Sequence, residues 1–188
     1  SGSEVRSVNG DIQLTGNSGL TTNGEINHGI SVLASGKIIS TGDGNITLVG
    51  NSQSGTNTNM GIEVNNNSQV ISNKGNISFK GNSLAAGDNN YGIWIINKST
   101  VQSTEGSISL TGISKGTGNN NDGINIKDTS TVQSIGAGSI TLDGTSGNGI
   151  VNSTGISISN STVRSAEGNI TLTGTSKGTG DGNDGILF

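Results

Sequence analysis

The feature that most constrains this chain is a seven-residue motif that occurs six times along its 188 residues. The last copy, GNITLTG at 168–174, has close counterparts at five earlier positions. A phrase beginning with Gly-Ile follows each copy, and successive Gly-Ile pairs lie 32, 31, 31, 32 and 30 residues apart. The earlier copies are GDIQLTG (10–16), GNITLVG (44–50), GNISFKG (75–81), GSISLTG (106–112) and GSITLDG (138–144). Self-similarity at a fixed period of this length indicates a solenoid, in which each repeat stacks on its neighbours.

Each repeat contains three short segments in which apolar and polar residues alternate. A period of two is typical of β-strands with one buried face. The third segment reads Val-x-Ser or Ile-x-Ser, as in VQS at 101–103 and IIS at 38–40. The sequence therefore predicts an all-β fold: a right-handed, single-stranded parallel β-helix of about six coils of ~31 residues, with three short strands per coil.

Stacking the repeats places equivalent apolar residues in five columns inside the predicted helix, so 28% hydrophobic residues suffice for a narrow core. Serine and asparagine residues form equally regular polar columns, and stacked asparagine amides can form hydrogen bonds along the axis. The apolar columns are Ile12/Ile46/Ile77/Ile108/Ile140/Ile170, Leu14/Leu48/Phe79/Leu110/Leu142/Leu172, Ile30/Ile62/Ile93/Ile124/Ile156/Ile186, Val32/Val64/Ile95/Ile126/Ile158/Phe188 and Val5/Ile38/Val70/Val101/Val132/Val163. The main polar columns are Ser7/Ser40/Ser72/Ser103/Ser134/Ser165, Ser18/Ser52/Ser83/Ser114/Ser146/Ser176 and Asn27/Asn59/Asn90/Asn121/Ser153/Asn183.

The repeat extends over residues 5–188, which are interpreted as one domain without separate caps, and residues 1–4 as a disordered cloning remnant. Bare end coils present open strand edges. We therefore expect either a piece of a longer stalk or ends that stack head to tail on other copies.

Composition excludes several classes of protein. The chain has no Cys, which rules out disulfides and thiolate metal sites, and its net charge of −4 without a basic stripe argues against a nucleic-acid partner. No stretch has the apolar length of a membrane span. No cofactor is predicted.

The phrases GNITLTG (168–174), GIWI (92–95) and STVRS (161–165) resemble the filamentous haemagglutinin-like proteins, the β-helical exoproteins of bacterial two-partner secretion. The resemblance covers residues 5–188. It implies a secreted or cell-surface fibrous protein that acts as a stalk in adhesion or biofilm formation, or as an extracellular filament. It implies no catalytic residue and transfers no binding residue to this chain.

Trp94 carries the main hypothesis for ligand binding. In GIWI it lies between inward-facing Ile93 and Ile95, so parity places it outside the helix. An aromatic ring beside carboxylate and amide groups is suited to a glycan or a partner surface. Packing under a nearby loop is the alternative. The predicted patch is Met60, Glu63, Tyr91, Trp94, Asp122 and Asn125.

A polysaccharide-degrading lyase or hydrolase is the second functional hypothesis. Asp122 and Asp184 share a column two coils apart, roughly 10 Å, the outer limit for an inverting carboxylate pair. Thr154 lies between them and no Lys or Arg falls in the column. The single histidine, His28, is interpreted as an exposed turn residue. These features favour a protein that is not an enzyme.

Two further hypotheses remain open. The turn TGDGNDG at 179–185 suggests a weak calcium site with Asp181 and Asp184, although the tandem nonapeptide of calcium-binding β-rolls is missing. An ice-binding face would use two outward columns in which Lys80 and Asp143 interrupt the hydroxyl-bearing side chains. These columns are Gln13/Thr47/Ser78/Ser109/Thr141/Thr171 and Thr15/Val49/Lys80/Thr111/Asp143/Thr173.

Overall fold

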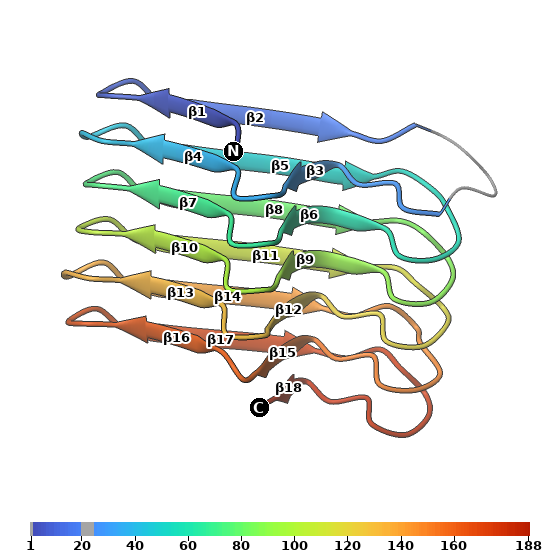
Figure 1. Cartoon of the computed structure of the whole chain (residues 1–188). Helices are drawn as coiled ribbons and strands as arrows, with labels where there is room; N and C mark the ends of the chain where they lie inside the picture. Colours follow the sequence, from blue (N-terminus) through green and yellow to red (C-terminus); the bar gives the residue numbers. More distant parts are fainter. Residues whose placement is uncertain (1, 20–24) are drawn as a thin grey trace.

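The computed structural model describes residues 2–19 and 25–188, which wind into a parallel β-solenoid of six turns with no helix among them (Figure 1). Each complete turn contributes three short strands, which confirms the predicted fold class. The first strand begins at Glu4, one residue before the predicted start of the repeat domain, and Ser1 lies outside the described residues. The described part of the chain contains no helix that could span a bilayer.

The strands form three parallel sheets of six strands each, named here A, B and C. Sheet A contains β1 (Glu4–Ser7), β4 (Lys37–Ser40), β7 (Gln69–Ser72), β10 (Thr100–Ser103), β13 (Thr131–Ser134) and β16 (Thr162–Ser165). Sheet B contains β2 (Ile12–Asn17), β5 (Ile46–Ser52), β8 (Ile77–Ser83), β11 (Ile108–Ser114), β14 (Ile140–Thr145) and β17 (Ile170–Thr175). Sheet C contains β3 (Ile30–Val32), β6 (Met60–Val64), β9 (Tyr91–Ile95), β12 (Ile124–Lys127), β15 (Ile156–Ser159) and β18 (Ile186–Leu187).

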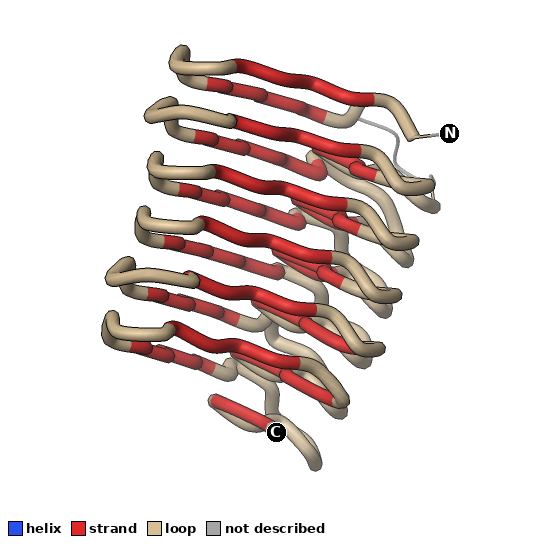
Figure 2. The backbone as a smooth tube through the Cα atoms, turned by 60° about the vertical axis from the view of Figure 1, so that its left-hand side comes forward, coloured by secondary structure: helices blue, strands red, loops and turns tan. Residues whose placement is uncertain are grey.

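The register of the sheets follows the sequence repeat residue by residue. Ile46 pairs with Ile77, Phe79 pairs with Leu110, and Ile93 pairs with Ile124. Because equivalent residues lie directly above one another, the turns stack as parallel layers with nearly the same outline (Figure 2). Every strand except those at the two ends of the stack therefore has hydrogen-bonded neighbours on both sides.

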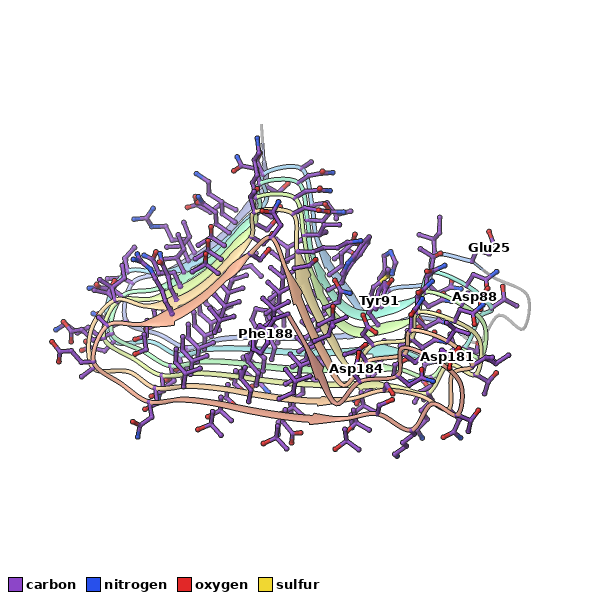
Figure 3. All side chains as sticks on the ribbon, turned by 90° about the horizontal axis from the view of Figure 1, so that it is seen from below. Glu25, Asp88, Tyr91, Asp181, Asp184 and Phe188 are labelled. Atoms are coloured by element: carbon purple, nitrogen blue, oxygen red, sulfur yellow. The ribbon has the colours of Figure 1, made fainter. Side chains whose placement is uncertain are left out.

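The five predicted apolar columns form one continuous core. In the middle coils their members are fully enclosed, and the largest is Phe79. At the two ends the same columns open to solvent, with Val5 and Ile170 each 44% exposed and Phe188 80% exposed. Viewed along the axis, Phe188 lies over the interior between the sheets (Figure 3).

The predicted polar columns form ordered rows of hydrogen bonds. In the asparagine row, the backbone N–H of Asn59 donates to Oδ1 of Asn90 at 2.9 Å, and the N–H of Asn90 donates to Oδ1 of Asn121 at 2.9 Å. Ser153 replaces asparagine in one coil, and its Oγ accepts from the N–H of Asn121. Side chains thus bond mainly to backbone rather than to one another, so each coil satisfies buried donors of the coil before it.

A second row of hydrogen bonds runs in the opposite direction at the start of sheet B. There the N–H of Asn76 donates to Oδ1 of Asn45 at 2.9 Å, and the N–H of Ser107 donates to Oδ1 of Asn76 at 2.8 Å. In this exposed row the later coil supplies the donor and the earlier coil supplies the acceptor. Each coil is therefore bonded through side chains to both of its neighbours.

The loops between sheets B and C form a lobe beside the three-sided core (Figure 3). Sheet B meets sheet C so closely that a Cβ on Gly81 would lie 2.2 Å from the carbonyl oxygen of Gly92, which explains the glycine in every copy of the phrase. The residue just before the asparagine row has a positive φ in all six loops: Ile26, Thr58, Asn89, Asn120, Asn152 and Gly182. Asparagine and glycine adopt this left-handed conformation readily, whereas Ile26 and Thr58 are β-branched and strained there.

Candidate functional site

A groove runs along the outer face of sheet C, between that sheet and the lobe. In Figure 3, Tyr91 and Asp184 lie in the notch between the two, whereas Glu25, Asp88 and Asp181 lie on the lobe away from it. One section of the groove has a volume of about 430 Å³ and extends over four coils. Its lining residues are Asn89, Tyr91, Asn120, Asp122, Asn125, Lys127, Asn152, Thr154, Ser157, Ser159 and Leu187.

Tyr91 and Trp94 form a stacked aromatic pair at one end of this section. Their ring centroids are 5.4 Å apart with an interplanar angle of 25°, and Nζ of Lys127 lies 5.5 Å from the centroid of the Trp94 ring. Trp94 lies between buried Ile93 and Ile95, so the prediction that it points outward is confirmed. Its Nε1–H is enclosed and has no hydrogen-bond partner among the described residues. Burial and the nearby carboxylate of Asp122 raise the pKa of Tyr91 well above its usual range.

Asp122 and Asn125 lie on the C-terminal side of the aromatic pair. One oxygen of Asp122 accepts the Nδ2–H of Asn125 at 2.6 Å, and the other accepts the backbone N–H of Thr154 at 2.8 Å. Burial raises the pKa of Asp122 to about 6, and these two hydrogen bonds and the charge of Lys127 limit the rise. Asn125 is 8% exposed, yet its Oδ1 has no partner among the described residues. The side of the groove next to Trp94 thus holds an enclosed carboxylate and an unused amide oxygen.

Glu63 and His28 lie on the N-terminal side of the pair. Oε2 of Glu63 is 3.4 Å from Nε2 of His28, and Oε1 accepts the Nδ2–H of Asn65 at 2.8 Å. Nδ1 of His28 accepts the N–H of Met60 at 3.2 Å. Burial lowers the pKa of His28, and Glu63 partly offsets this. The interpretation of His28 as an exposed turn residue is therefore wrong: its side chain is 13% exposed and lies against Glu63.

The structure brings the six residues of the predicted patch together, as the coil register required. Met60 pairs with Tyr91, and Trp94 pairs with Glu63 on one side and Asn125 on the other. All except Trp94 are buried, however, including Met60 at 0% and Tyr91 at 7% exposed. The predicted open aromatic platform is therefore a packed cluster, and the accessible surface lies farther along the groove.

The two aspartates of the predicted carboxylate pair, Asp122 and Asp184, have different environments in the folded chain. Asp122 is buried with both oxygens accepting hydrogen bonds, whereas Asp184 is exposed near the last strand. Asp181 lies on the lobe, away from the notch that contains Asp184 (Figure 3). Among the described residues, no group of three His, Cys, Asp or Glu side chains could hold a metal ion.

The two hydroxyl-rich columns lie on the outer face of sheet B, as predicted. Val49 and Lys80 are register partners in one of them, and so are Thr111 and Asp143. Lys80 and Asp143 are both exposed, so charged side chains project from the middle of this face.

Sequence reasoning missed the wall of the groove that the lobe contributes. Asn89, Asn120 and Asn152 precede the Gly-Ile phrase by three residues in successive coils and have φ values of 56°, 55° and 53°. A recurring asparagine before a glycine-rich turn is a signal for this conformation. It could have located the wall, although not the way the lobe folds back toward sheet C.

Comparison of the chain with family models, with curated proteins and with solved structures gives no match. The candidate site is therefore defined by its own geometry.

Proposed function

We propose that this chain is a structural segment of a secreted or cell-surface fibrous protein, and that it serves as a rigid adhesin stalk or a self-stacking extracellular filament. The observation that carries the proposal is the unbroken register of three sheets over six turns. Such a stack extends by adding coils without changing its cross-section, which is the geometry a stalk or filament needs.

The distribution of polar groups supports the same role. Hydrogen-bond rows on both sides of each coil join neighbouring layers, and the core is continuous along the axis. The apolar columns open at both ends, where Val5, Ile170 and Phe188 are exposed. Further coils of the same polypeptide, or another copy of the chain, would cover these residues favourably.

Negative-stain electron microscopy with light scattering across a concentration series tests this proposal. Fibres one solenoid wide whose mass grows with concentration support the filament. Discrete particles with an axial length of about 29 Å, six coils at ~4.8 Å each, support the stalk segment. Particles of irregular width, or loss of the β-sheet circular dichroism signal, would contradict both.

Two functional assays separate this role from the alternatives. Release of reducing or unsaturated sugar ends from polysaccharides that depends on Asp122 would support the degrading enzyme. Thermal hysteresis in a freezing assay that is lost in Thr141→Lys would support ice binding by sheet B. The structural role predicts neither activity.

A further inference from the structure

The groove beside the lobe has the chemistry of a binding site, and a structural role does not account for it. Its lobe wall is a row of three side-chain amides, Asn89, Asn120 and Asn152, in consecutive coils. Nδ2 of Asn120 donates to Oδ1 of Asn89 at 3.3 Å, and both residues line the groove. An amide offers both donors and acceptors, so this wall can bond to a ligand that carries both.

The opposite wall and the floor add hydroxyl and carboxylate groups. Ser157 and Ser159 line the groove from sheet C, and Thr154 and Asp122 lie at its base. The unpartnered Oδ1 belongs to Asn125, a lining residue that is more than nine-tenths buried. A buried acceptor without a partner is costly, and a ligand or water donor delivered into the groove would remove that cost.

The aromatic pair closes one end of the groove. Tyr91 lines it, and Trp94 stacks behind Tyr91 with Lys127 against its ring. Tyr91 is 7% exposed, so the pair closes this end of the groove without offering an open ring face, and the accessible length lies beyond it over the following coils. Lys127 and Asp122 balance in charge, so the lining favours neither a polyanion nor a polycation.

These features select among ligand classes. A peptide partner would need apolar pockets for its side chains, yet Leu187 is the one aliphatic residue among those that line the groove. A nucleic acid would need a basic surface, and this section contains one lysine. Side-chain amides and hydroxyls in a groove of about 430 Å³ suit a short saccharide, which carries hydrogen-bond donors and acceptors.

We propose that this groove binds a short neutral oligosaccharide, laid along the solenoid axis between the amide row of the lobe and the outer face of sheet C. The inference goes beyond the structural role and does not depend on it. An isolated stalk segment, a filament and a longer chain would all present the same groove.

Trp94 makes the test direct, because it is the only tryptophan in the chain and it adjoins the groove. The purified chain is titrated with cellotetraose, maltotetraose and chitotetraose, and both tryptophan fluorescence and calorimetric heat are recorded. We expect saturable binding of at least one of these neutral tetramers. Calorimetry detects a ligand that binds without altering Trp94.

Variants locate the binding. Asn120→Gly/Asn152→Gly removes two amides and keeps both left-handed backbone positions unstrained, while Ser157→Tyr fills the groove from the other wall. Each is expected to weaken binding at least tenfold. The matched control is Asn66→Gly/Asn97→Gly, which removes two amides from left-handed positions at the opposite end of the sheet C strands and should leave binding unchanged.

Several results would overturn the proposal. These are no saturable signal from any neutral tetramer by either method, or binding that both groove variants retain while folded by circular dichroism. Tetragalacturonate is titrated in parallel as the acidic comparison, and binding confined to it would also overturn the proposal, because that result assigns the groove to acidic glycans. Electron microscopy of the same samples reports on the structural role separately, so failure of one proposal is distinguishable from failure of the other.

Discussion

One outward column of sheet B and the outward column of sheet C belong to the same coils but follow opposite rules. On sheet B, the column that begins at Gln13 repeats small hydroxyl residues in every later coil. On sheet C, the corresponding outward column reads Ser31, Glu63, Trp94, Asn125, Ser157 and Leu187, a different chemistry in nearly every coil.

The difference separates what the fold requires from what it permits. Inward positions must fit the coil above and below, so they repeat on both sheets. Outward positions on sheet C are free of that requirement, and they vary where the lobe forms a groove beside them. Variation at a concave surface is the pattern expected of recognition rather than of stacking.

The largest expected effect tests whether the two sheets are equivalent on the inside. Phe79→Ala on sheet B should lower the free energy of unfolding by about 3–5 kcal/mol, and Ile93→Ala on sheet C by about 2–5 kcal/mol, because both side chains are fully buried. Urea denaturation followed by circular dichroism measures both. The outward neighbour Ser78→Ala should change stability by less than about 0.5 kcal/mol. A cost near zero for either core variant would show that its sheet does not share the core.

The next effect concerns pH and should arise on sheet C only. Burial raises the pKa of Asp122 from 3.8 to about 6, so between these values the folded chain holds a proton that the unfolded chain releases. Stability is therefore expected to fall by up to about 3 kcal/mol as pH rises through this window, and to stay level above it. Asp122→Asn removes this slope, and Asn125 can then offer its unused Oδ1 to the new amide.

The measurement is the free energy of unfolding of both proteins from pH 4 to pH 8. The lowered pKa of His28 acts in the opposite sense, because stability then falls as pH drops below 6.5, but it is common to both proteins and cancels in their difference. Asp143→Asn, on the exposed outer face of sheet B, is the control and should keep the wild-type profile. Identical profiles for wild type and Asp122→Asn would disprove the assignment.

A smaller effect tests the asparagine row behind the groove. Asn90 is fully buried, and its Oδ1 accepts from both the backbone N–H and the Nδ2–H of Asn59. Asn90→Ala should cost about 1–3 kcal/mol, since it leaves buried donors without a partner. Asn90→Ser should cost less, because Ser153 already serves in this row and accepts from Asn121. Equal melting temperatures for the two variants would contradict this account.

The smallest effect is a gain in stability in the lobe. Thr58 has a φ of 61°, which strains a β-branched residue, whereas the three following coils place asparagine at this position. Thr58→Asn is expected to stabilise the chain by about 1 kcal/mol, as measured by thermal denaturation. Thr47→Asn, on a regular strand of sheet B, should give no gain. A loss of stability in Thr58→Asn would show that Thr58 makes a compensating contact.

The sequence predicted most of the fold because stacking forces a period that can be read directly. Ile46 and Ile77 face inward by parity, and Trp94 faces outward by the same rule. The site was harder to predict, because the lobe follows no period of two. The sequence grouped Tyr91 with Trp94 correctly, but it could not show that Tyr91 is buried with its ring stacked on the indole. The sequence also placed Asp122 near Asn125 and Thr154, but it could not show that the side chain of Asn125 and the backbone of Thr154 each donate a hydrogen bond to its carboxylate.

The two opposed hydrogen-bond rows couple the stability of each coil to that of both neighbouring coils. Loss of the Asn90 side chain removes the acceptor of the Asn59 N–H in the preceding coil. Loss of the Asn76 side chain removes the acceptor of the Ser107 N–H in the following coil. A defect in the asparagine row therefore weakens the preceding coil, and a defect in the row at the start of sheet B weakens the following coil. Loosening of an inner coil weakens a neighbour as well, so the inner coils should melt together rather than one turn at a time.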